Sequence, residues 1–217
     1  MSGFIIYHPA RCVQTFGNTT VYFDKPTRNQ DPYIWNRLFL HSYCHITQRP
    51  FEKDDINFWV NSPRFRGFTE LYCDLVFVVG EKIYWKHKNH ISRNDPIVDS
   101  AVAYNDHYRW GKYEHHFTRH RRFTLKANSK LSFQPQGIDG KLLDILPFLV
   151  KCGLGIDELR IGMQAGFSSQ PLEIEHDLAL RLYEYLNTKA KIKLTGTTLA
   201  RIRKLNTHLA SPSPRKK

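Results

Sequence analysis

The stretch Glu70-Leu-Tyr-Cys-Asp-Leu-Val-Phe-Val-Val-Gly-Glu-Lys-Ile-Tyr-Trp85 carries the clearest indication of the fold. Its centre, Cys73 to Val79, is an apolar run of strand length, with Asp74 as a polar residue near its start. Gly80-Glu81 has the composition of a two-residue hairpin turn, in which glycine supplies a positive φ, and Ile83 to Trp85 then form the returning strand. The sequence therefore predicts a central antiparallel hairpin over residues 70–86.

Shorter elements are predicted on both sides of this hairpin. β-branched and aromatic residues favour strands at 3–7, 19–23, 98–104, 121–126 and 131–133. Asp31-Pro32 is typical of a helix start, because an N-cap acceptor is followed by a proline that suits the first turn. Apolar residues at helical spacing follow, and we expect one early helix over residues 32–46.

After residue 140 the apolar period changes to that of helices. Helices are predicted over 142–152 and 156–164, in a segment opened by Ser169, and from Thr197 or Thr198 onward. The expected fold class is α+β, with a mixed or antiparallel sheet and a helical C-terminal section. A length of 217 residues favours a single domain over 1–210, sheet-rich over 1–135 and helical over 140–210, followed by a disordered basic tail at 211–217.

The positive charge of the chain is concentrated in two segments. The formal net charge is +12, yet residues 187–217 contain nine lysines and arginines and no acid, and residues 107–130 contain seven against one glutamate. A localised positive field favours a polyanionic partner, because neutralised phosphates release their condensed counterions. The charge pattern therefore predicts nucleic acid as the partner, although DNA and RNA are not distinguished.

The segment 105–122 is the part of the sequence that folding explains least. It holds four histidines, four arginines, one lysine and four aromatic residues in 18 positions. Arginine pairs with phosphate, aromatic rings stack on bases, and histidine exchanges protons near neutral pH. The candidate catalytic residues are His107, His115, His116 and His120. The candidate nucleic-acid-binding residues are Arg109, Lys112, Arg119, Arg121, Arg122, Lys191, Lys193, Arg201 and Lys204.

These residues leave three functions open. The first is an intracellular nucleic-acid-binding protein that contacts phosphates through both basic segments. The second is a metal-independent nuclease that uses the four histidines as general acid and base. The third is an assembly subunit whose basic surfaces meet an acidic protein partner. The sequence leaves the existence of an enzymatic activity undecided.

Several other classes of function are not expected. No apolar run approaches the roughly 18 residues of a membrane span, and no secretion signal is visible at the N-terminus, so a cytoplasmic location is expected. The four cysteines are far apart and are expected to be reduced, mostly buried thiols. His41 and His45, like His116 and His120, are four residues apart, which on a helix places two imidazoles on one face, but no third ligand is set by spacing. No phosphate-binding glycine loop is present either, so no metal and no cofactor is expected.

Overall fold

The computed structural model of the protein describes residues 2–7, 12–23, 42–45, 51–64, 69–84, 123–162, 171–196 and 198. The chain divides into two compact units. The first comprises Met1–Tyr22, Asp54–Val78 and Ser132–Leu194, and the second comprises the rest. Strand β6, Tyr72–Tyr84, contributes its first half to the first unit and its second half to the other.

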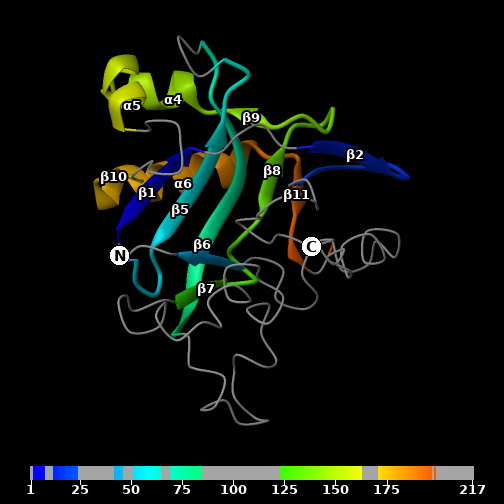
Figure 1. Cartoon of the computed structure of the whole chain (residues 1–217). Coiled ribbons are helices and arrows are strands. Elements are labelled where there is room, and N and C mark those ends of the chain that lie inside the picture. The colour runs from blue at the N-terminus through cyan, green and yellow to red at the C-terminus, as the bar shows by residue number, and fades with distance from the viewer. Residues whose placement is uncertain are drawn as a thin grey trace, which may run out of the picture. The chain divides into compact units, whose positions relative to one another are not determined.

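The first unit contains a mixed sheet, shown in Figure 1. Strand β1 (Gly3–Tyr7) pairs parallel with β5 (Ile56–Asn61), and β5 pairs antiparallel with β6. Strand β10 (Leu172–Ile174) pairs antiparallel with the other edge of β1, and β9 (Leu143–Asp144) with the start of β6. The expected α+β class with a mixed sheet is confirmed.

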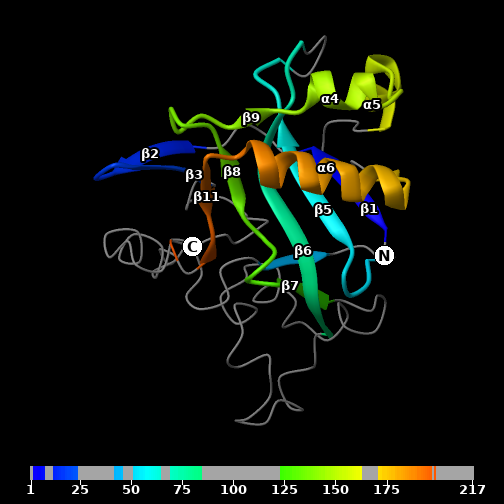
Figure 2. The ribbon, with the colours of Figure 1, turned by 180° about the vertical axis from the view of Figure 1, so that it is seen from behind.

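Helix α6 (His176–Lys189) packs on one face of this sheet, as Figure 2 shows. Its buried residues Ala179, Leu182 and Leu186 join the core formed by the apolar residues of the central strands. Gly3 permits this packing, because a Cβ built there would lie 2.3 Å from the Ala179 Cβ. Two short helices, α4 (Leu146–Lys151) and α5 (Ile156–Gly162), add Leu146, Leu149 and Leu159 to the same core.

The described part of the first unit also contains two small antiparallel sheets. Strand β8 (Gln134–Gln136) pairs with β11 (Ile192–Leu194), which follows α6 directly. Strand β2 (Cys12–Phe16) pairs with β3 (Thr19–Phe23) as a two-stranded ribbon across a turn at 17–18. Gly17 has a φ of 61° at this turn, which glycine adopts without steric cost.

The second unit contains a three-strand arrangement. Strand β7 (Phe123–Ala127) pairs antiparallel with residues 79–84 of β6 on one side and with β4 (Ser42–His45) on the other. The ladder between β6 and β7 shifts register between Val79 and Glu81. Gly80 lies at this irregularity, where an added Cβ would come within 2.9 Å of the Asn128 backbone nitrogen.

The predicted hairpin over residues 70–86 is wrong. β6 continues through Gly80-Glu81 as one strand of 13 residues, and the partner of its second half is β7 rather than a returning strand. The φ of Gly80 is also not positive, whereas a two-residue hairpin turn would require a positive φ there. Glycine is needed here for the close approach of β7 at a bulge.

The other predicted elements fit in part. The strands at 3–7 and 19–23 are confirmed, and the one at 121–126 is found at Phe123–Ala127. The prediction of an early helix over residues 32–46 is wrong at its end, because Ser42–His45 form strand β4 and pair with β7. The rest of residues 32–46 lies outside the described part of the chain. The segment opened by Ser169 forms strand β10 before α6 begins at His176. The predicted strand at 98–104 also lies outside the described part.

Candidate nucleic-acid interface

Two of the predicted site residues, Lys191 and Lys193, fall in the described part of the chain. The other predicted phosphate contacts and all four candidate catalytic histidines lie outside it. Those residues are Arg109, Lys112, Arg119, Arg121, Arg122, Arg201, Lys204, His107, His115, His116 and His120.

Lys191 and Lys193 belong to a basic end of the first unit, which we define as Lys189, Lys191 and Lys193. Lys189 is in the last turn of α6, and the helix stops at Ala190, whose backbone is extended with φ −63° and ψ 119°. The Lys191 N–H donates to the Gln136 carbonyl at 2.9 Å, and the chain then enters β11. Lys191, just before the strand, and Lys193, within it, are both exposed, whereas Leu194 is buried.

The three lysines of the basic end carry positive charges that no carboxylate in the described part of the chain neutralises. All three residues are exposed. The Lys193 Nζ donates to the Asn187 Oδ1 at 2.6 Å and lies 5.8 Å from the centre of the Phe133 ring. These contacts orient Lys193 but leave its charge uncompensated, so the group remains available to an anion.

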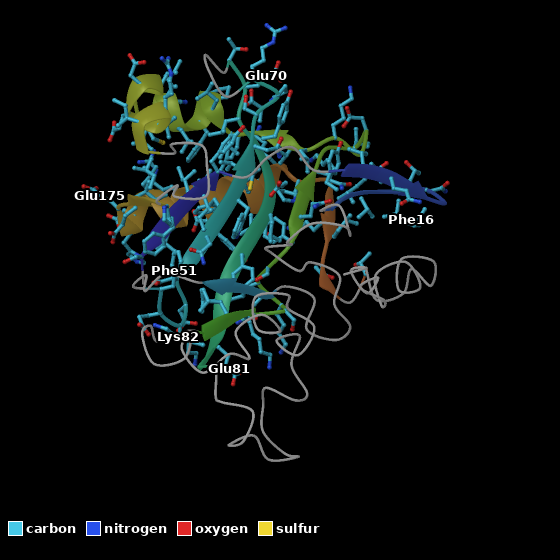
Figure 3. All side chains as sticks on the ribbon, viewed as in Figure 1. Phe16, Phe51, Glu70, Glu81, Lys82 and Glu175 are labelled. Atoms are coloured by element: carbon cyan, nitrogen blue, oxygen red, sulfur yellow. The ribbon has the colours of Figure 1, made fainter. Side chains whose placement is uncertain are left out.

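The first unit is otherwise acidic. Its described residues include twelve aspartates and glutamates against eight lysines and arginines. Glu173, Glu175 and Asp177 lie around the start of α6, and Figure 3 shows Glu175 at the end of the helix opposite to β11. Because acids repel phosphate, a polyanion that approaches this unit is directed to the basic end.

Two lysines of the second unit are already paired. The Lys126 Nζ lies 3.0 Å from a Glu81 carboxylate oxygen, and the Lys82 Nζ lies 2.8 Å from one of Glu52. Lys126 belongs to the basic segment 107–130 of the sequence. Its charge is compensated locally, so it adds less to a positive field than the sequence count implies.

A layer of buried polar side chains in the first unit was not predicted from the sequence. Gln134 is fully buried on β8, and its Nε2 donates to the Tyr22 carbonyl and to the Asp74 carbonyl, both at 2.9 Å. Its Oε1 accepts from the Tyr22 N–H at 3.0 Å and from the Gln136 Nε2 at 3.0 Å. The Gln136 Nε2 also donates to the Thr20 carbonyl at 2.9 Å. The two glutamines thus hold the outer edge of β3.

Asp74 is the buried carboxylate nearest to this layer. Its side chain accepts a hydrogen bond from the Asn61 Nδ2 at 3.2 Å, and both residues are buried. No group of three or more histidine, cysteine, aspartate or glutamate side chains in the described segments is arranged to hold a metal ion. The contact that Asn61 makes with Asp74 is a buried side-chain hydrogen bond. The sequence did not predict this polar layer. Gln134 and Gln136 alternate with Phe133 and Pro135, a pattern typical of a strand whose polar side chains face solvent.

Two groups at the start of β6 have raised pKa values. The Tyr72 hydroxyl donates to the Glu70 carboxylate, and this bond is the main cause that raises the pKa of Tyr72 to about 12. Burial raises the pKa of the Cys73 thiol well above its usual range, and the neighbouring Asp74 adds to the effect. Cys73 is therefore a free, protonated and unreactive thiol, in line with the expected role of the cysteines as buried thiols.

None of the helices in the described part of the chain has the length and apolar character needed to cross a membrane. Comparison of the chain with models of protein families, with curated proteins and with solved structures finds no match. The interpretation of the basic end therefore depends on its own chemistry.

Proposed function

We propose that the protein binds nucleic acid and that the basic end of the first unit contacts phosphates. One observation carries this proposal: Lys189, Lys191 and Lys193 are exposed, lack a carboxylate partner among the described residues, and open the acid-free segment 187–217. Lys191 directly precedes β11 and Lys193 lies within it, so two exposed ammonium groups are close together along the chain. Adjacent ammonium groups of this kind bind a repeating anion better than a single one.

The second basic segment is assigned to the same activity. Residues 107–130 hold the arginines and lysine that the sequence predicts as phosphate contacts, together with aromatic residues suited to stacking. The cytoplasmic location stays a prediction from the sequence. The nuclease activity of the histidines and an acidic protein partner remain alternatives, which the binding experiment separates.

The test is a triple substitution of the basic end to glutamine: Lys189→Gln, Lys191→Gln and Lys193→Gln. Each change removes a charge while keeping a polar side chain of similar length. The matched control replaces three exposed lysines elsewhere, Lys53, Lys141 and Lys151, by glutamine. Both proteins lose three formal charges, so the change in net charge is equal, although the Lys141 ammonium lies 3.5 Å from an Asp139 carboxylate oxygen.

Binding is measured by fluorescence anisotropy with labelled single-stranded and duplex DNA and RNA. We expect the triple variant to bind at least about tenfold more weakly than the control protein, because three phosphate contacts are lost. Equal affinity of the two variants would contradict the proposed contact. Absence of binding by the wild-type protein to all four probes would contradict the function itself and favour the protein-partner alternative. Degradation of a probe in the presence of EDTA would favour the nuclease.

A further inference from the structure

The ribbon formed by β2 and β3 lies at the outer side of the first unit. Figures 1 and 2 both show β2 projecting beyond β8 and β11, and Figure 3 places Phe16 on this projection. Among the described residues, the ribbon is a sheet of two strands. Val13, Gln14 and Thr15 are exposed, and 56% of Val13 is accessible to solvent. The ribbon therefore presents an edge strand to its surroundings.

The two edges of the ribbon differ. On β3, the side chains of Gln134 and Gln136 bond to the backbone of Tyr22 and Thr20, which shows that these two residues direct their N–H and C=O groups away from β2. The hydroxyls of Thr15 and Thr20 lie 3.4 Å apart across the ribbon, so these residues face each other. In an antiparallel ladder, residues opposite outward-directed ones are also directed outward. Val13 and Thr15 therefore direct their backbone groups away from β3.

Within the described residues, the outer edge of β2 has no backbone partner and carries none of the usual protection. The ribbon sequence, Cys12 to Phe23, contains no charged residue and no proline. Edge strands of monomeric proteins are commonly protected by lysine, proline or a bulge. An unprotected edge with β-branched residues is instead suited to pairing with another strand.

We propose that β2 pairs with β2 of a second copy of the chain, antiparallel and about a twofold axis at Gln14. This arrangement places Val13 of one copy opposite Thr15 of the other, and the two residues exchange both of their hydrogen bonds. The axis repeats the pair, so four backbone hydrogen bonds form. The result is one four-stranded sheet whose outer β3 edges are held by the glutamines of each copy.

A second copy is the occupant that the spacing of the edge favours, and the absence of charge on the ribbon lets two positively charged copies approach there. The chain has a net charge of +12, so two copies repel each other over most orientations. The ribbon is an uncharged part of the surface. The edge is also self-complementary, since its outward groups at Val13 and Thr15 are spaced equally on either side of Gln14.

The test is a cysteine placed at the axis. In the paired arrangement, residue 14 of both copies forms a non-hydrogen-bonded pair with Cα atoms about 4.5 Å apart, within the range of a disulfide. Gln14→Cys should therefore yield a covalent dimer under mild oxidation. The matched control is Asn18→Cys, an exposed position in the turn of the same ribbon, about 10 Å along the ribbon from the axis. The wild-type chain shows the background from its four native cysteines.

We expect most of the Gln14→Cys protein, and little of the Asn18→Cys or wild-type protein, to migrate as a dimer without reductant. Adding Thr15→Pro to Gln14→Cys should lower the dimer fraction severalfold, because it removes two of the four intermolecular donors while the ribbon itself keeps its bonds. Equal cross-linking of Gln14→Cys and Asn18→Cys, or no effect of Thr15→Pro, would overturn the proposal.

Hydrogen exchange of the wild-type chain gives a second readout, which does not depend on whether a substituted protein folds. The amides of Val13 and Thr15 should become protected as protein concentration rises, whereas the amide of Gln14, directed toward β3, should be protected at all concentrations. Protection of Val13 and Thr15 that does not change with concentration would contradict pairing between copies.

Discussion

Gln134→Leu should destabilise the protein far more than the same substitution at Gln136. Both glutamines are fully buried on β8 and lie two residues apart, so the two changes bury the same new side chain on the same strand. The Gln134 amide makes four hydrogen bonds, to the Tyr22 N–H and carbonyl, the Asp74 carbonyl and the Gln136 amide. The Gln136 amide makes two, one of which is shared with Gln134.

The magnitudes follow from these bonds. Each hydrogen bond contributes about 0.5–1.5 kcal/mol net, so the loss of four bonds at Gln134 should lower the free energy of unfolding by about 2–6 kcal/mol. At Gln136 two bonds are lost, but the substitution also removes a buried Oε1 that has no hydrogen-bond partner in the described structure. Removing an unsatisfied acceptor relieves about 1–3 kcal/mol, so the net cost at Gln136 should be about 1 kcal/mol or less.

The assay is urea denaturation followed by circular dichroism, with the free energy of unfolding extrapolated to water. An unchanged denaturant slope would show that both variants unfold from a comparable native state. The reasoning would be refuted if Gln136→Leu cost as much as Gln134→Leu, because the hydrogen-bond layer would then not be organised around Gln134.

Two further predictions concern β6. Gly80→Ala should lower stability by about 1–3 kcal/mol in the same denaturation assay, because the new Cβ meets the backbone of Asn128 at 2.9 Å, and an unchanged midpoint would argue against the bulge. Tyr72 should ionise with a pKa of about 12 rather than 10.0, and Glu70→Gln should bring this value toward 10, as measured by tyrosinate absorbance against Tyr72→Phe. Since the raised pKa favours the protonated folded state, the contribution of Tyr72 to stability should be complete below pH 10 and lost as the pH rises to 12. A Tyr72 pKa that Glu70→Gln does not change would contradict this cause.

Local composition predicted the parts of the fold that depend on local preference. The strands at 3–7 and 19–23 and the apolar run of β6 were recognisable because β-branched and aromatic residues occur in runs of strand length. The hairpin prediction at Gly80-Glu81 was wrong because glycine is favoured both in two-residue hairpin turns and at β-bulges. Only the pairing with β7, more than 40 positions away, distinguishes them.

The candidate site, like the fold, was predictable from the sequence only in part. The sequence predicted the charge of Lys191 and Lys193, since an acid-free run is visible without any structure. It did not indicate that Lys126 is compensated by Glu81, because those residues meet across two strands. The roles of Gln134 and Gln136 were also hidden, since a glutamine in an alternating strand reads as solvent-exposed until its partners on Tyr22 and Thr20 are known.

The salt dependence of nucleic-acid binding tests the proposed phosphate contacts most directly. Each lysine that neutralises a phosphate contributes about 0.9 to the slope of log K against log salt for duplex DNA, or about 0.7 for a single strand. The triple variant at Lys189, Lys191 and Lys193 should therefore have a slope smaller than that of wild type by about 2–3, whereas the control at Lys53, Lys141 and Lys151 should keep the wild-type slope. A triple variant whose slope equals that of wild type would show that the basic end does not contact phosphate.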